Sequence, residues 1–192
     1  MYFKKVVGER CYLSPINPED FEHYTHWVND MEVGIGMVFS SSIVTVDQER
    51  EILKRLSSSQ KNFAIIDIVT NKVIGNVGFV NLDHMNQTGE VGIFIGNRAY
   101  LGKGYGTEAM KLILDFGFNI LNLHNISLKV YEYNMPAYKS YKKVGFKEAG
   151  RIRKAKMIGG VRYDEVYMDI LAEEFESPYI KGLVESKLNC GK

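Results

Sequence analysis

The chain has 192 residues, which is enough for one domain with a complete hydrophobic core. Its 24 basic residues nearly balance its 23 acidic residues, and the formal net charge of +1 argues against electrostatic capture of nucleic acid or of an anionic membrane. The 2 cysteines, Cys11 and Cys190, are too isolated for a disulfide framework or a zinc site, and the 4 scattered histidines predict no metal site. No apolar run has the length of a signal peptide or a membrane span, so the cytoplasm is the expected compartment.

The first third of the sequence predicts one strand and two helices. Residues 10–16 read as the strand, and Asn17 with Pro18 predicts a helix start, because Asn17 can act as the N-cap and Pro18 suits the first helical position. Thr45 and Gln48 have the spacing of a capping box, which predicts the start of a second helix. The apolar stripes expected to face the core are Phe21, Tyr24 and Val28 in the first helix and Val46, Leu53 and Leu56 in the second.

The middle third predicts three strands, at residues 63–69, 73–80 and 90–95. A turn at residues 70–72 and a polar connection at residues 81–88 join them, and links this short favour antiparallel pairing. A glycine-rich turn then precedes an amphipathic helix. The apolar face of that helix would consist of Met110, Ile113, Leu114, Gly117, Phe118 and Leu121.

The last third predicts a strand, a helix and a hairpin. Residues 125–131 alternate apolar and polar side chains, and Pro136 opens a helix that Gly145 with Phe146 is suited to end. The pair Gly159-Gly160 is a candidate hairpin turn between two final strands. The stripe of the helix would consist of Ala137, Tyr141 and Val144.

The predicted order of elements is β-α-α-β-β-β-α-β-α-β-β. It indicates an α/β protein, of α+β type, with a mixed sheet that is antiparallel in its first half and has one strand–helix–strand crossover. We expect a single domain over residues 1–171 and a charged C-terminal tail over residues 172–192.

The glycine-rich turn, Leu101 to Thr107, has three glycines in five residues and lies between a strand and a helix. Glycines let the backbone approach a ligand closely, and the unpaired N–H groups at the start of a helix suit a phosphate or pyrophosphate. Lys103 would add positive charge at the rim. A Walker A loop is excluded, because Gly104 stands where that motif needs Ser or Thr. Two alternatives stay open: the dinucleotide fingerprint Gly104-x-Gly106-x-x-Ala109, and a flexible turn that binds nothing.

Two separated motifs resemble the GCN5-related N-acetyltransferase (GNAT) superfamily. The run 98–106 is similar to its acetyl-CoA-binding motif, Q/R-x-x-G-x-G/A, with Gly104 and Gly106 at the two small positions and Leu101 at the position of Gln or Arg. The run 134–146 is similar to the family element N-x-x-A-x-x-x-Y-x-x-x-G-F. Residues 27–30 and the closing hairpin, 156–170, are similar to the ribosomal-protein and spermidine N-acetyltransferase branch, so the resemblance extends over residues 10–171.

The resemblance implies a GNAT fold whose fourth and fifth predicted strands splay apart around the pantetheine arm of acetyl-CoA. The arm would pair with the backbone of Ile93, Phe94 and Ile95. The pyrophosphate would bind the backbone N–H groups of Leu101, Gly102, Lys103, Gly104, Tyr105, Gly106 and Thr107. On the other side of the arm would lie Asn134 and Ala137, and Tyr141 would face the thioester sulfur.

Acetyl transfer to an amine needs a neutral amine and a proton for the departing thiolate. Because an alkyl amine with a pKa near ~10.4 is almost wholly protonated at pH 7, a base is needed, and Glu90 is the candidate, acting through water. Its alternative is a structural carboxylate at the start of a strand. Tyr141 is the candidate acid, and its alternative is a core tyrosine. Neither cysteine lies in a motif, which favours direct transfer over a covalent acyl-enzyme.

The sequence thus predicts an acetyl-CoA-dependent N-acetyltransferase with a small amine or a peptide N-terminus as the acceptor. A non-catalytic acyl-CoA-binding sensor and a nucleotide-dependent oxidoreductase are the alternatives. Polyamine acetyltransferases of the branch carry an acidic cluster after the first helix, whereas residues 39–42 are uncharged here, which argues against spermidine. A homodimer is an open alternative to a monomer.

Overall fold

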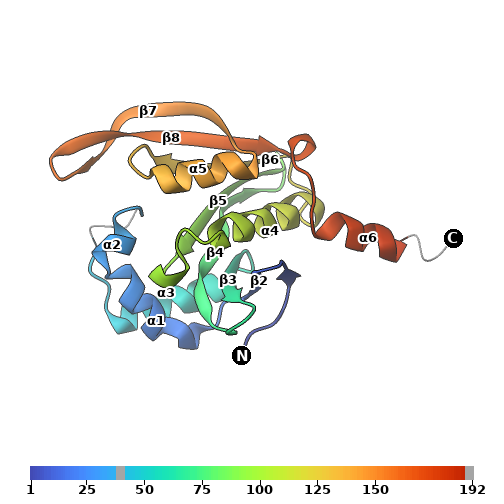
Figure 1. Ribbon diagram of the computed structural model, residues 1–192, viewed down its shortest axis with the longest axis horizontal. Coiled ribbons are helices and arrows are strands. Elements are labelled where there is room, and N and C mark those ends of the chain that lie inside the picture. Colours follow the sequence, from blue (N-terminus) through green and yellow to red (C-terminus); the bar gives the residue numbers. More distant parts are fainter. Residues whose placement is uncertain (38–41, 189–192) are drawn as a thin grey trace. The chain divides into compact units, whose positions relative to one another are not determined.

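The computed structural model describes residues 1–37 and 42–188. The chain forms two compact units: the first unit contains Met1–Gly78 and Ile93–Leu112, and the second unit contains Phe79–Gly92 and Ile113–Lys192. Three elements contribute residues to both units, and Figure 1 lets the reader follow them along the chain. They are strand β4 (Val73–Asp83), strand β5 (Thr88–Ile95) and helix α4 (Tyr105–Asn119).

The first unit is an antiparallel sheet with short helices packed on it. Its further strands are β1 (Val6–Val7), β2 (Cys11–Pro15) and β3 (Asn62–Asp67), which pair antiparallel in sequence order and continue into the first half of β4. Its helices are η1 (Pro18–Asp20), α1 (Phe21–Val28), α2 (Met31–Gly34), α3 (Val46–Ser58) and η2 (Arg98–Tyr100).

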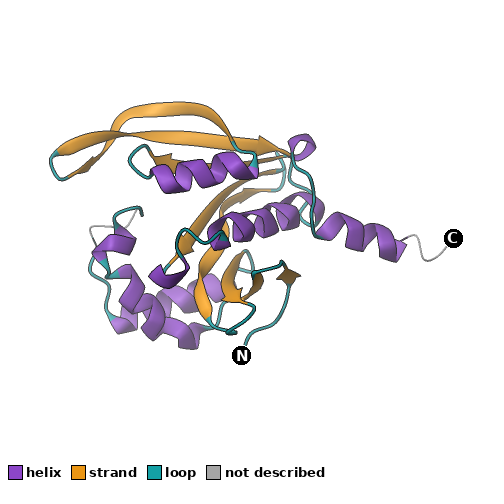
Figure 2. Ribbon diagram, viewed as in Figure 1, coloured by secondary structure: helices purple, strands orange, loops and turns teal. Residues whose placement is uncertain are grey.

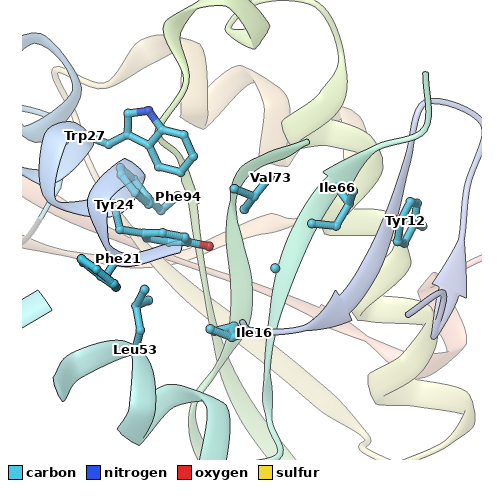
Figure 3. Close-up of a cluster of buried hydrophobic side chains, with 10 residues drawn as sticks. Tyr12, Ile16, Phe21, Tyr24, Trp27, Leu53, Ile66, Val73 and Phe94 are labelled. Carbon is cyan, nitrogen blue, oxygen red and sulfur yellow. The ribbon is translucent and has the colours of Figure 1, made fainter. Parts of the chain in front are cut away.

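The core of the first unit gathers around the aromatic face of α1 (Figure 3). Tyr24 is fully buried, its ring centroid lies 5.1 Å from that of Trp27, and its hydroxyl donates to the carbonyl of Gly75 at 2.9 Å. The ring centroid of Phe94, from β5, lies 6.3 Å from that of Trp27, with an angle of 66° between the ring planes. The other members of the cluster are Tyr12, Ile16, Phe21, Leu53, Ala64, Ile66 and Val73. This cluster fixes the end of β5 against the helical layer.

The second unit continues the sheet with the second half of β4, the first half of β5 and three further strands. These are β6 (Asn125–Tyr131), β7 (Lys147–Ile158) and β8 (Val161–Leu171), and the helices are α5 (Met135–Val144), η3 (Ala172–Glu174) and α6 (Ile180–Leu188). β6 and β8 pair antiparallel, and β7 and β8 form the long two-stranded ribbon seen in Figure 2. The strand order is β1-β2-β3-β4-β5-β6-β8-β7, which confirms the predicted mixed α/β sheet.

The only parallel pairing in the described part of the sheet joins β5 to β6. It begins with Thr88 opposite Asn125 and ends with Glu90 opposite Ser127, so it covers three residues of each strand. β5 continues for five residues beyond this ladder, to Ile95. A ladder this short between neighbouring parallel strands agrees with the splay expected of the fold.

Local sequence signals set most of the element boundaries. The side chain of Asn17 accepts from the N–H of Glu19, and Thr45 and Gln48 form both hydrogen bonds of a capping box. Gly145 ends α5 in the left-handed region, at φ +118°, a conformation that favours glycine. The glycines of the 159–160 turn have φ of +58° and +79°, as a tight two-residue hairpin requires.

The structure differs from the sequence prediction at several places. β4 runs on to Asp83 and β5 begins at Thr88, so the connection is a tight turn over residues 84–87 instead of a polar loop over residues 81–88. Asp83 stabilises this turn by accepting from the N–H groups of Met85 and Asn86, both at 3.0 Å. β1 and α2 were not predicted. Val46 is 45% exposed, so it does not belong to the buried stripe of α3.

The segment that follows β8 is attached to α4 through a buried carboxylate. Asp115 has no exposed surface, and its Oδ1 accepts from Ser177 at 2.5 Å and from Asn119 at 2.8 Å. Its Oδ2 accepts from the backbone N–H groups of Tyr179 at 2.8 Å and Ile180 at 3.0 Å. Asp115 therefore supplies the hydrogen-bond acceptor that the start of α6 needs.

No helix in the described ranges is long and apolar enough to cross a membrane.

Candidate functional site

The glycine-rich turn lies in the first unit and leads directly into α4. Gly102 and Gly104 have φ of +70° and +89°, which a residue with a Cβ adopts only with strain. A Cβ placed on Gly102 would have no atom within 4 Å, so the turn faces open space. α4 begins at Tyr105, and its positive dipole end points at this turn. This geometry suits an anion, and binding of one at the turn stays a prediction.

Asp67, at the end of β3, holds the two ends of the turn. Its Oδ1 accepts from the Tyr105 hydroxyl at 2.9 Å, and its Oδ2 accepts from Thr70 and, at 3.4 Å, from the Tyr100 hydroxyl. The rings of Tyr100 and Tyr105 pack edge to face with their centroids 5.0 Å apart. Burial disfavours the charged carboxylate, but the hydrogen bonds from Thr70 and Tyr105 outweigh this and lower the pKa of Asp67. No local sequence signal marked Asp67 as part of the site.

A second carboxylate fixes the first turn of α4 from the other side. Glu108 is 8% exposed, and its Oε1 accepts from the backbone N–H groups of Glu9 at 2.5 Å and Arg10 at 2.9 Å. A Cβ on Gly8 would lie 2.0 Å from the same oxygen, so this turn of backbone fits closely around the carboxylate. The segment between β1 and β2 is thereby tied to the helix that begins at the glycine-rich turn.

The end of β5 provides the predicted backbone edge. Phe94 is buried, whereas Ile93 and Ile95 are half-buried. A Cβ on Gly75, in β4, would lie 2.0 Å from the carbonyl oxygen of Phe94, so the two strands approach closely here. All three residues lie beyond the last pair of the ladder with β6. Their edge directed away from β4 is therefore the one that could pair with an extended ligand.

Glu90, the candidate base, lies in the second unit and is already engaged. Its Oε1 is 3.1 Å from the ammonium of Lys129, on β6, and its Oε2 accepts from the side-chain amide of Asn81, on β4, at 3.3 Å. The hydrogen bond to Glu90 raises the pKa of Lys129, whose ammonium also lies 5.5 Å from the ring centre of Tyr167. Glu90 is thus part of a polar network over neighbouring strands, and its side chain keeps 22% exposure.

α5 places Asn134, Ala137 and Tyr141. The side-chain oxygen of Asn134 accepts from the N–H of Ala137 at 3.3 Å, so Asn134 is the N-cap of α5, and its amide nitrogen is the group left to meet a ligand. The ring of Tyr141 packs edge to face on Phe146 with the centroids 6.1 Å apart. Burial raises the pKa of Tyr141 to about 12, and in the described ranges its hydroxyl has no hydrogen-bond partner.

The candidate residues therefore divide between the units. The first unit holds Ile93–Ile95 and the glycine-rich turn, and the second holds Glu90 and the three residues of α5. Sequence reasoning missed Asp67 and Arg10, which reach the turn from distant parts of the chain, and Glu108, which directly follows it. Of the uncharged stretch at residues 39–42, all but Ser42 lies outside the described residues.

Comparison with known proteins decides the family. The model of the acetyltransferase (GNAT) domain matches residues 10–147. The chain belongs to the GNAT acetyltransferase family. It is 30% identical to an uncharacterized N-acetyltransferase, p20, of Bacillus licheniformis, over 87% of this chain and 96% of that one. It is 34% identical to the spermidine N(1)-acetyltransferase of Escherichia coli, over 85% of this chain and 87% of that one.

Among solved structures, the fold resembles that of the spermidine N-acetyltransferase of Vibrio cholerae in complex with CoA and spermine. The TM-score is 0.77 at 24% identity, with 87% of this chain and 98% of that chain covered. The protein is thus a GNAT-fold N-acetyltransferase, an enzyme that transfers an acetyl group to an amine. None of these matches supports an oxidoreductase, and no cluster of three or more potential metal ligands occurs among residues 1–37 and 42–188.

Proposed function

We propose that this enzyme uses acetyl-CoA as its acetyl donor and transfers the acetyl group directly to a primary amine, either of a small molecule or of a protein N-terminus. The observation that carries the proposal is the glycine-rich turn. Two glycines with positive φ lie at the start of a 15-residue helix, Gly102 facing open space and Gly104 lying beside the side chain of Arg10, and this geometry suits a diphosphate. The V. cholerae relative of the same fold was captured with CoA, which supports this donor.

Each group of site residues fits one part of acetyl-CoA. The N–H groups from Gly102 to Thr107 would bind the diphosphate, with Lys103 adding charge at the rim. The predicted contribution of Leu101 is corrected here, because its N–H already donates to the carbonyl of Arg98 at 3.1 Å. The backbone of Ile93–Ile95 would pair with the amide groups of the pantetheine arm, as a neighbouring strand would. The amide nitrogen of Asn134 would contact the arm from the side of α5, next to Ala137. Acetyl-CoA supplies the activated acyl group, a thioester.

Glu90 is proposed to help remove the proton of the acceptor ammonium, through a water molecule. In the structure its two oxygens are held by Lys129 and Asn81. An acceptor that reaches Glu90 must therefore share or displace one of these partners. The competing possibility is that Glu90 only links the strands. The pH dependence of the acetyl-transfer rate of the Glu90→Gln variant distinguishes the two roles.

Tyr141 is proposed to give its proton to the departing CoA thiolate. A phenol whose pKa is about 12 stays protonated at every physiological pH, so the proton is available whenever the thioester reacts. The transfer to a thiolate with a conjugate pKa near ~8.5 is uphill between isolated groups, so collapse of the tetrahedral intermediate must help to drive it. The hydroxyl of Tyr141, which has no hydrogen-bond partner in the described part of the chain, supports this role, whereas the packing of its ring on Phe146 is what the core alternative would also require.

The acceptor is proposed from chemistry alone. The E. coli relative acts on spermidine, but the uncharged stretch after α1 in this sequence favours small amines and peptide N-termini over polyamines. We expect the enzyme to work in the cytoplasm, with a homodimer as an alternative to a monomer.

An acceptor panel scored by release of free CoA tests this function. The panel contains spermidine, an amino sugar, simple alkyl amines and peptides with free N-termini, each measured with acetyl-CoA. We expect amine-dependent CoA release with at least one class. In parallel, calorimetric titration with CoA and with NADH should show binding of CoA alone. Binding of CoA without turnover on any amine would instead favour a sensor, and binding of NADH would favour the dinucleotide reading.

A further inference from the structure

Arg10 comes from the N-terminal edge of the sheet, yet it lies at the glycine-rich turn. It stands directly before β2, and its backbone N–H is fixed by the carboxylate of Glu108 at 2.9 Å. Glu108 belongs to the first turn of α4, the same turn of helix that follows the glycines. The backbone of Arg10 is therefore held in a constant position relative to the start of α4.

The side chain of Arg10 extends over Gly104. A Cβ built on Gly104 would lie 3.4 Å from Nε of Arg10 and 4.0 Å from its Cδ. Apart from Gly104 and its two neighbours in the chain, no other described residue has an atom within 4 Å of that position. The side chain of Arg10 therefore lies directly next to Gly104.

The guanidinium of Arg10 has no acidic partner among residues 1–37 and 42–188. The two nearby carboxylates are used otherwise: Glu108 accepts from two backbone N–H groups, and Asp67 accepts from Thr70, Tyr100 and Tyr105. Arg10 is also exposed, so its donors are available to a ligand. A planar guanidinium with available donors, next to the positive dipole end of α4, matches the oxygens of a phosphate.

The turn itself carries only one cation, Lys103, and Leu101 occupies the position at which the acetyl-CoA motif has Gln or Arg. The chain therefore lacks a guanidinium or amide within the turn. Arg10, which lies 91 positions before Leu101 in the sequence, places a guanidinium beside Gly104 of the turn.

We propose that Arg10 is a ligand for a phosphate group of CoA at this turn. The proposal rests on the proposed use of acetyl-CoA. Arg10 would donate to phosphate oxygens from the side of β2 while the N–H groups of the turn donate from the start of α4. CoA carries phosphate in two places, the diphosphate and the 3′-phosphate of its ribose, and the guanidinium has the chemistry for either.

The test is calorimetric titration of the purified full-length protein with CoA, with dephospho-CoA, which lacks the 3′-phosphate, and with pantetheine, which lacks both kinds of phosphate. The variant is Arg10→Gln, with Arg10→Lys as the conservative form. Arg153→Gln is the matched control, because Arg153 is also exposed and lies on β7, in the second unit. Thermal unfolding without ligand confirms that each variant is folded.

We expect Arg10→Gln to weaken CoA binding by about 10- to 100-fold, Arg10→Lys to weaken it less, and Arg153→Gln to leave it unchanged. Pantetheine binding should not respond to Arg10. An equal loss for CoA and dephospho-CoA places the contact on the diphosphate, and a loss confined to CoA places it on the 3′-phosphate. CoA affinity in a folded Arg10→Gln protein within twofold of the wild type overturns the inference alone. Failure of the wild-type protein to bind CoA overturns the proposed function as well.

Discussion

The Oδ1 atom of Asp67 and the hydroxyl oxygen of Tyr105 lie 2.9 Å apart and join the end of β3 to the first residue of α4. Burial and this hydrogen bond raise the pKa of Tyr105 to about 12, while the hydrogen bonds that Asp67 receives lower its own pKa. At neutral pH, Tyr105 is therefore protonated and donates, and Asp67 is ionised and accepts. Because Tyr105 lies between Gly104 and Gly106, its contact with Asp67 positions the turn.

We therefore expect Tyr105→Phe to weaken CoA binding by several-fold and to lower the free energy of unfolding by about 1 kcal/mol, the usual effect of one lost hydrogen bond. Calorimetry and chemical denaturation measure the two effects.

A carboxyl group whose pKa is lowered by folding, such as that of Asp67, stabilises the fold above its unfolded pKa, near ~3.9, and this contribution is lost as the pH falls through the folded value. In the Asp67→Asn variant, the free energy of unfolding should therefore depend less on pH in the acid range. An unchanged pH dependence in that range would contradict this role of Asp67.

Gly104→Asp should weaken CoA binding by at least about 30-fold, or ~2 kcal/mol. The new side chain must adopt a φ of +89°, and its carboxylate would repel phosphate and lie next to the guanidinium of Arg10. Gly150→Asp is the control, because Gly150 lies on exposed β7 with no atom within 4 Å of an added Cβ. Unchanged CoA affinity in a folded Gly104→Asp protein would remove the glycine-rich turn from the site.

Glu90→Gln should slow acetyl transfer at pH 7, and the loss should shrink toward pH 9.5, where the acceptor amine is increasingly neutral without help. Lys129→Met is the matched comparison, because it removes the same ion pair from the other side. If Glu90 is the base, Lys129→Met keeps most of the rate. If both variants lose the same rate at all pH values, the pair is structural and Glu90 is no base.

Tyr141→Phe should lower kcat by about 100-fold and change the affinity for acetyl-CoA little, as expected for a lost general acid. The loss should be the same from pH 6 to pH 9, since a phenol with a pKa of about 12 does not titrate there. This constancy distinguishes the effect from that of Glu90→Gln. Near-normal turnover of the variant with a good acceptor would leave Tyr141 as a packing residue against Phe146.

Much of the fold was predictable because its signals are local. The capping box at Thr45, the N-cap at Asn17 and the glycine at residue 145 each depend on neighbours within four positions, and the structure has all three where the sequence put them. β1 has two residues and α2 has four, which is too short for a periodic pattern to be recognised.

The surroundings of the site were not predictable for the opposite reason. Asp67 lies 38 positions before Tyr105, and Glu108 lies 98 positions after Arg10. Such contacts depend on how the strands assemble, and one sequence alone gives no pattern for them. The role of Glu90 was inferred from the base that acetyl transfer requires, and those of Asn134 and Tyr141 from a family motif. All three stay predictions until the variants are measured.

Asp115 has a practical consequence for anyone who shortens or tags this enzyme. The family match ends at residue 147 and the last strand ends at Leu171, which suggests Leu171 as a point at which to truncate the chain. Truncation there would instead delete Ser177, Tyr179 and Ile180, and leave the buried carboxylate of Asp115, near the end of α4, with Asn119 as its one remaining donor in the described chain. An affinity tag should therefore follow the last residue of the chain, and a protein truncated at Leu171 should aggregate or unfold at lower temperature than the full chain.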